Sequence, residues 1–176
     1  ADDFVVTGAT RELLEQKVKP ALTAFLHPRG LELSEQKTVL SHVTKGFDFL
    51  GHTLRKYEDK LLITPAKGKI QILREKIRRL MQAALALTQE ALLRQLNPLL
   101  RGWANYYRNG AAKAIFGKLD DYVWRKLWRW ITRRHPKKSQ AWMKGQYFSA
   151  AGDKGLFSVG VHSQKGQSRL LTLYRM

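Results

Sequence analysis

The chain has 176 residues, and its 32 Lys and Arg side chains outnumber 14 Asp and Glu, giving a formal net charge of +18. Hydrophobic residues make up 44%, enough for a packed core, and the absence of cysteine excludes disulfides and thiolate metal sites. No apolar run approaches the ~20 residues that cross a bilayer. We therefore expect no membrane association and a cytoplasmic protein of bacterial type, with an organellar one as the alternative.

The positive charge is concentrated in the middle of the chain. Residues 1–65 hold nine basic and nine acidic side chains, whereas residues 66–138 hold eighteen basic and four acidic ones. Residues 139–176 add five basic side chains and one acidic one. A solvated basic face is one reading of this pattern, but such a local surplus repels itself unless a partner relieves it. Nucleic acid is the leading partner, because neutralising phosphates releases counterions.

Residues 1–65 predict a mixed structure. Apolar residues at helical spacing predict a helix from Thr10, which can cap it, to His27, with a kink or a looser turn at Pro20. Short apolar or alternating runs bounded by turn residues predict strands, of which the last two form a hairpin. These strands are expected at residues 3–7, 30–33, 38–40, 47–54 and 61–63.

The middle of the chain predicts an almost wholly helical structure, and the last segment predicts short strands. Pro98 lies inside the second expected helix and predicts two helical pieces or a bend. Large aromatic residues at helical spacing usually belong to a core, so we expect Trp103 and Tyr106 to be buried. The expected helices are residues 67–87, 88–107 and 114–134, and the expected strands are residues 156–159 and 170–174.

Two adjacent carboxylates, Asp2 and Asp3, precede an apolar run. Carboxylate oxygens are ligands that Mg²⁺ accepts beside a phosphate. Neighbouring strand residues point to opposite faces, so both can bind one metal only where a turn, such as a hairpin tip, separates them. On spacing alone, a polar chain end is the more common explanation.

Basic side chains on the expected helices are candidates for contacts to RNA phosphates and 2′-hydroxyl groups. Arg125, Arg129 and Arg133 lie on successive turns, a row suited to tracking a nucleic-acid backbone. Trp124 and Trp128 share that general side, and two outcomes stay open for them: stacking on bases or packing against a neighbouring helix. The candidate RNA-binding residues are Arg74, Arg78, Arg101, Asn105, Arg108, Arg125, Lys126, Arg129, Arg133 and Arg134.

Four motifs follow one another along the chain. They are residues 1–6 (Ala-Asp-Asp-Phe-Val-Val), residues 30–38, residues 46–52 (Gly-Phe-Asp-Phe-Leu-Gly-His) and residues 100–107 (Leu-Arg-Gly-Trp-Ala-Asn-Tyr-Tyr). The first resembles the tail of the Tyr-Ala-Asp-Asp box at the palm hairpin of reverse transcriptases. In this order the four resemble group II intron reverse transcriptases, the last motif lying at the heart of the maturase-specific thumb domain. Residues 122–136 extend the resemblance, which covers roughly the whole chain.

The resemblance implies an α+β fold in three parts. Residues 1–65 would be a small β-rich remnant of a polymerase palm, and residues 66–138 a mainly α-helical thumb or maturase domain. Residues 139–176 would extend that domain with short strands and stop before any endonuclease region.

The resemblance also implies roles for three residues near the polymerase centre. Asp2 and Asp3 would be palm carboxylates on catalytic Mg²⁺, expected to be idle here because the rest of the palm is missing. Lys37 would lie on the primer side of the active site, and a solvated lysine is an equally common alternative.

The function implied by the resemblance is that of an RNA-binding fragment of a maturase. Its partner would be structured intron RNA, which it would help to fold and splice. A full-length parent would also hold an RNA/DNA template–primer during RNA-directed DNA synthesis in retrohoming, with Mg²⁺ as cofactor. The fragment alone is expected to need no cofactor and to lack polymerase activity. A polymerase in its own right and a general basic nucleic-acid-binding structural protein are the alternatives, and the oligomeric state stays open.

Overall fold

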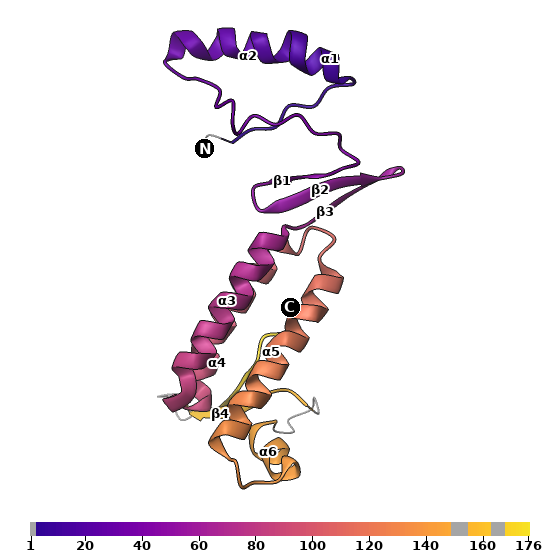
Figure 1. Ribbon diagram of the computed structural model, residues 1–176. Helices are drawn as coiled ribbons and strands as arrows, with labels where there is room; N and C mark the ends of the chain where they lie inside the picture. Colours follow the sequence, from indigo (N-terminus) through magenta and orange to yellow (C-terminus); the bar gives the residue numbers. More distant parts are fainter. Residues whose placement is uncertain (1–2, 149–154, 163–167) are drawn as a thin grey trace. The chain divides into compact units, whose positions relative to one another are not determined.

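The computed structural model describes residues 3–148, 155–162 and 168–176, and the chain divides into two compact units (Figure 1). We call Ala1–Ile63 the N-terminal unit and Thr64–Met176 the helical unit. Helices and strands both occur, which confirms the α+β class. Within the described ranges, no helix combines the length and the apolar character that crossing a membrane requires.

The predicted first helix is present in the N-terminal unit, but its pitch changes along its length. It consists of α1 (Arg11–Leu13), a π-helical turn η1 (Leu14–Val18), α2 (Lys19–Leu26) and a 3₁₀ turn η2 (His27–Arg29). The Thr10 hydroxyl accepts a hydrogen bond from the Leu13 amide at 3.2 Å, which confirms the cap. The π turn ends two residues before Pro20, where the sequence predicts a disturbance, because proline has no N–H to continue the ladder. Gly30, at φ 68°, ends the helix in the left-handed conformation.

A three-stranded sheet follows in the order β1-β2-β3, and β1 pairs antiparallel with β2. The strands are β1 (Phe47–Phe49), β2 (His52–Tyr57) and β3 (Lys60–Pro65). The predicted run 47–54 is therefore two strands, because the chain turns tightly at Leu50 and Gly51, with φ of 45° and 79°. The predicted turn between the second and third strands is confirmed.

Three expected strands of the N-terminal unit are wrong. The described residues at 3–7, 30–33 and 38–40 have no strand pairing. A strand requires a neighbour that completes its hydrogen bonds, and a β-branched composition alone does not supply one. Their apolar side chains are exposed, as shown by Phe4 at 53% and Val39 at 76%. Over residues 3–63 no side chain is buried.

The three helices expected in the middle of the chain are confirmed, each with shifted ends. The helical unit contains α3 (Lys67–Ala83), the 3₁₀ turn η3 (Ala84–Ala86), α4 (Gln89–Tyr107), α5 (Lys113–Arg134), α6 (Gln140–Tyr147), β4 (Ser158–His162) and β5 (Ser168–Thr172). The two strands pair antiparallel, with Ser158 opposite Thr172. Helix α6 was not predicted from the sequence. Its one signal is Ser139, whose hydroxyl caps the helix by accepting from the Trp142 amide at 3.2 Å.

The break expected at Pro98 is wrong as to two helical pieces, because α4 is continuous through the proline. The neighbouring Asn97 is buried and binds the chain around β5. Its side-chain amide donates to the Thr172 carbonyl at 2.8 Å, and its Oδ1 accepts from the Tyr174 amide at 2.9 Å. Leu96 and Leu100 are fully buried on either side, so packing holds the helix together where one backbone hydrogen bond is lost.

One hydrophobic core holds the helical unit together. Trp130 is 2% exposed, and its indole N–H donates to the Ala84 carbonyl at 2.8 Å. The segment after residue 138 contributes to the same core and therefore belongs to the same compact unit. The core residues include Leu73, Ile77, Met81, Leu92, Leu93, Leu96, Leu100, Leu119, Val123, Leu127, Trp130, Ile131, Met143, Tyr147 and Phe157.

Candidate nucleic-acid interface

The outer face of α5 carries a row of basic side chains. Leu119, Val123 and Leu127 repeat every four residues and are at most 1% exposed, which fixes the face that α5 turns to the core. Helical periodicity places the row formed by Arg125, Arg129 and Arg133 away from that stripe. All three side chains are exposed. We call this set the α5 arginine row.

The α5 arginine row is only lightly compensated by acidic groups. Arg125 pairs with Asp121 at 2.6 Å, and both side chains are more than half exposed, at 61% and 57%. Within the described residues, Arg129 and Arg133 have no acidic partner. Exposed pairs contribute little free energy, so a phosphate can compete for all three guanidinium groups.

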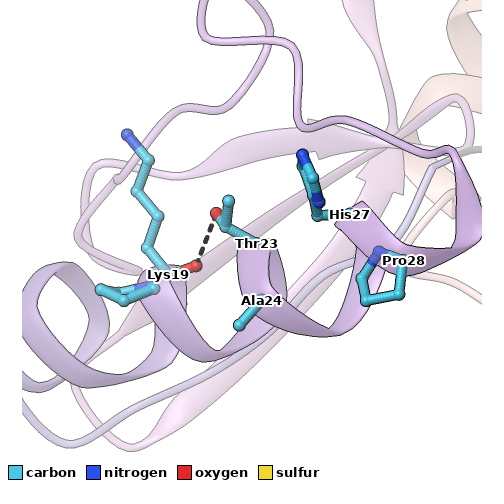
Figure 2. Close-up of a pocket in the computed structure, with 6 residues that line it drawn as sticks. Lys19, Thr23, Ala24, His27 and Pro28 are labelled. Atoms are coloured by element: carbon cyan, nitrogen blue, oxygen red, sulfur yellow. Dashed lines mark hydrogen bonds between the residues drawn. The ribbon is translucent and has the colours of Figure 1, made fainter.

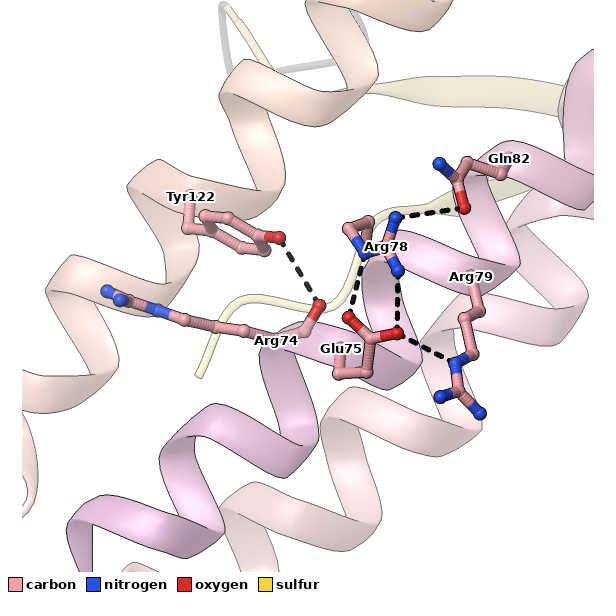
Figure 3. A network of polar contacts seen from close by, with 6 residues as sticks. All are labelled: Arg74, Glu75, Arg78, Arg79, Gln82 and Tyr122. Atoms are coloured by element: carbon pink, nitrogen blue, oxygen red, sulfur yellow. Dashed lines mark hydrogen bonds and ion pairs between the residues drawn. The ribbon is translucent and has the colours of Figure 1, made fainter.

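A second group of basic residues lies where α3 meets α5, around Tyr122 (Figure 3). The Tyr122 hydroxyl donates to the Arg74 carbonyl at 3.2 Å, which ties the two helices. The Arg74 guanidinium and the Lys126 ammonium each lie 5.3 Å from the centre of the Tyr122 ring. Cation–π attraction to one ring therefore holds two positive charges at this seam.

Glu75 is the acidic member of this region (Figure 3). Its carboxylate accepts hydrogen bonds from Arg78 at 2.7 and 2.8 Å and from Arg79 at 2.8 Å. These bonds lower the pKa of Glu75 from 4.5 to about 2, and the same contact raises the pKa of Arg78. Two arginines share one carboxylate, so the cluster keeps a positive charge.

The predicted residues of α4 lie on a different surface. The Arg101 guanidinium is 5.4 Å from the centre of the Tyr174 ring, on the flank of α4 where Asn97 binds the chain around β5. Asn105 and Arg108 are exposed. The structure therefore separates these candidates from the α3–α5 seam instead of gathering the whole predicted set on one face.

Arg134 has a structural position. One of its terminal nitrogens donates to the Leu85 carbonyl at 2.9 Å and to the Leu87 carbonyl at 2.6 Å. Its guanidinium also covers the Trp130 ring at 4.6 Å. These bonds satisfy carbonyls in the connection after α3, a role for which the sequence gives no signal. Arg134 is therefore engaged within the fold and is not part of the proposed RNA-contacting set.

For Trp124 and Trp128 the sequence leaves two outcomes open, stacking on bases or packing against a neighbouring helix. Their rings stack on one another, with centroids 5.7 Å apart and planes 3° apart. Trp128 also contacts Phe148, at 6.0 Å between ring centroids. Trp124, at the other end of the stack, is 43% exposed. Packing therefore accounts for Trp128, while Trp124 presents an aromatic surface to solvent.

The expected burial of Tyr106 is wrong, because its side chain is 56% exposed. Tyr107 is the buried aromatic residue, at 4%, and the burial raises its pKa. The buried stripe of α4 passes through Leu100, Ala104 and Tyr107, at spacings of four and three, which leaves Tyr106 beside it. Trp103 is half-buried and lies against Tyr107 at 4.4 Å.

Three residues are expected near a polymerase centre, and the structure describes two of them, Asp3 and Lys37. Asp2 lies outside the described residues, and Asp3 is exposed in a segment without strand structure. Lys37 is exposed in a turn, where its amide donates to the Ser34 carbonyl at 3.1 Å. Over the described part of the chain, no three His, Cys, Asp or Glu side chains could hold a metal ion together. The described residues therefore offer no metal centre of their own, and the assignment of Asp2 and Asp3 to Mg²⁺ stays a prediction.

A hollow of about 510 Å³ lies along α2 in the N-terminal unit (Figure 2). One helical stretch, from Lys19 to Pro28, supplies its whole lining. The Thr23 hydroxyl already donates to the Lys19 carbonyl at 3.0 Å, and no acidic side chain lines the hollow. It is the surface of a single helix and not an enclosed binding site.

The helical unit is thus a small α-helical domain with a hydrophobic core and a basic exterior. Residues 70–148 match the family model of the group II intron, maturase-specific domain. The matched segment runs from the first turn of α3 to the residue after α6, and the match supports the resemblance to the C-terminal region of group II intron maturases. No curated protein matches the chain.

Proposed function

We propose that the helical unit binds structured intron RNA and helps the intron to fold for splicing. The maturase-specific domain points to intron splicing, and the surface of that domain points to RNA. The observation that carries the proposal is the α5 arginine row. Its three arginines are exposed on successive turns, and within the described residues Asp121, beside Arg125, is their one acidic partner.

The arrangement favours recognition of RNA shape over base sequence. Guanidinium groups one helical turn apart, about 5–6 Å, can meet successive phosphates of a backbone. Arg74 and Lys126, held on Tyr122, add positive charge at the seam with α3. A basic surface of this kind contacts phosphate and 2′-hydroxyl groups, which structured RNA presents along its shallow groove.

We propose a second role for the N-terminal unit, as the end of a polymerase palm in a longer parent. Its support is the resemblance of residues 1–6 and 46–52 together with the many apolar side chains exposed over residues 3–63. In that parent the thumb would hold an RNA/DNA template–primer during retrohoming. Asp2 and Asp3 would then bind Mg²⁺ with further palm carboxylates, and Lys37 would face the primer.

The salt dependence of RNA affinity tests the RNA-binding proposal. If about six phosphates are neutralised, log K against log salt should have a slope of about −4 to −5 for a folded intron RNA. Replacing Arg125, Arg129 and Arg133 together by Gln should flatten that slope by about two to three units, because three phosphate contacts are lost.

The matched control removes three positive charges from the N-terminal unit. Lys17, Lys19 and Arg29, replaced by Gln, change net charge by the same amount and should leave the slope within about one unit of the unmodified chain. A full slope in the variant of the α5 arginine row would place the RNA surface elsewhere. Equal binding of intron RNA and an unrelated structured RNA, with no effect on splicing, would favour a general nucleic-acid-binding protein instead.

A further inference from the structure

A groove of about 400 Å³ runs between α3 and α4, apart from the α5 arginine row. We call it the α3–α4 groove. Its volume falls in the range of small-molecule sites. Its lining includes Lys69, Ile72, Lys76, Gly102, Trp103 and Tyr106.

The walls of the α3–α4 groove are apolar and aromatic, and they are open to solvent. Ile72 on α3 is 51% exposed and Tyr106 on α4 is 56% exposed, so both side chains present apolar surface to solvent. Trp103 is held firmly, because its ring lies 4.4 Å from Tyr107 and 5.9 Å from Phe116. The groove thus has a fixed aromatic wall and exposed apolar rims.

Two lysines give the groove its charge. Lys69 and Lys76 are seven residues apart on α3, so they share one face about 10 Å apart along the helix axis. Both are exposed, and within the described residues neither pairs with a carboxylate. Arg74 and Arg78 lie on the other flank of α3, towards Tyr122, and so belong to the seam with α5.

We propose that the α3–α4 groove binds one unpaired nucleotide of RNA, whose base stacks on Tyr106 while Lys69 and Lys76 meet the flanking phosphates. An aromatic surface in one groove with two cations is complementary to a base and its two flanking phosphates. A base within a duplex is stacked on its neighbours and is not available, so the groove selects bulged or looped nucleotides. The inference rests on the proposed RNA binding and adds to it a subsite with a different specificity.

Gly102 makes a direct test possible, because it lines the groove and a Cβ built there meets no atom within 4 Å. Gly102→Leu fills the groove without removing a charge, and it replaces a helical glycine with a better helix former. Gly145→Leu on α6 is the matched control, since a Cβ there also meets nothing within 4 Å. The thermal midpoint of each variant, followed by circular dichroism, establishes that it is folded.

The probes are two RNA hairpins of the same stem, one fully paired and one with a single bulged adenosine. The intact chain should bind the bulged hairpin about tenfold more tightly than the paired one, because one base stacks on an aromatic ring. Gly102→Leu and Tyr106→Ala should each abolish this preference without weakening the paired hairpin, whereas Gly145→Leu and Tyr106→Phe should keep it.

The outcomes separate this inference from the proposed function. Equal binding of the two hairpins by the intact chain, with the salt slope retained, overturns the groove as a nucleotide site and leaves RNA binding in place. A preference that survives Gly102→Leu also overturns it, because the bulged base then binds elsewhere. Failure to bind either hairpin overturns the proposed function itself.

Discussion

The two units of this chain have similar fractions of apolar residues but differ in how much of that apolar surface they bury. The helical unit buries many of its large side chains in one core, whereas residues 3–63 bury none and expose residues such as Phe25 and Leu61 at 57% and 52%. Their charge differs as well, because the N-terminal unit is neutral and the whole surplus of +18 lies after it. The comparison shows that the buried core and the surplus of positive charge lie in the same part of the molecule.

Hydrogen exchange on the intact chain should show the largest contrast. Backbone amides in the middle of α4 and α5, above a buried core, are expected to exchange only through global unfolding. Amides of α2 and β1 should exchange through local opening, and faster by a factor on the order of 10³ or more, since a domain of this kind is stable by at least ~5 kcal/mol. Protection of the N-terminal unit equal to that of α5 would contradict the comparison.

Single truncations of aromatic residues should sharpen the contrast. Trp130→Ala should lower the free energy of unfolding by ~3–5 kcal/mol, because it leaves a cavity and removes the hydrogen bond to the Ala84 carbonyl. Trp103→Ala should lower the free energy of unfolding by less than Trp130→Ala does, because Trp103 is only half-buried. Phe4→Ala should change the free energy of unfolding by no more than about 0.5 kcal/mol, because the Phe4 side chain is 53% exposed. Urea unfolding followed by circular dichroism measures all three, and a Phe4 effect as large as that of Trp130 would show that the N-terminal unit has a core.

The smallest expected effect concerns Glu75 in the helical unit. Its pKa in the folded chain is about 2, below the ordinary 4.5, so its ionised form stabilises the fold above about pH 4.5 and this contribution is lost as the pH falls towards 2. A carboxyl titration followed by NMR measures the pKa directly. Replacing Arg78 and Arg79 by Gln should return it towards 4.5, and a value near 4.5 in the unmodified chain would rule out the arginine contacts.

The sequence predicted the helices of the helical unit well, because long amphipathic patterns with caps such as Thr88 specify a helix locally. It failed where structure depends on distant partners. The run at residues 3–7 has strand composition but no neighbouring strand in the described residues, and Pro98 is tolerated because Asn97 and two leucines are held by packing.

The candidate site was predictable only in part, for the same reason. Residue spacing alone indicated the α5 arginine row, since it depends on one helix. The other features of the site depend on contacts between elements, which the sequence does not reveal. Arg134 donates to the carbonyls of Leu85 and Leu87, and the α3–α4 groove forms only where two helices meet. The expected burial of Tyr106 also failed, because the buried stripe of α4 passes through the next residue, Tyr107.

The most direct test of the central claim, that RNA binding belongs to the helical unit, is photochemical cross-linking of the intact chain to a folded group II intron RNA, with the linked peptides identified by mass spectrometry. We expect the cross-links to fall within α3, α4 and α5, concentrated near Arg125, Arg129 and the exposed Trp124 ring, and to disappear first at high salt. Cross-links concentrated in residues 3–63, with few or none in the three helices, would contradict the account.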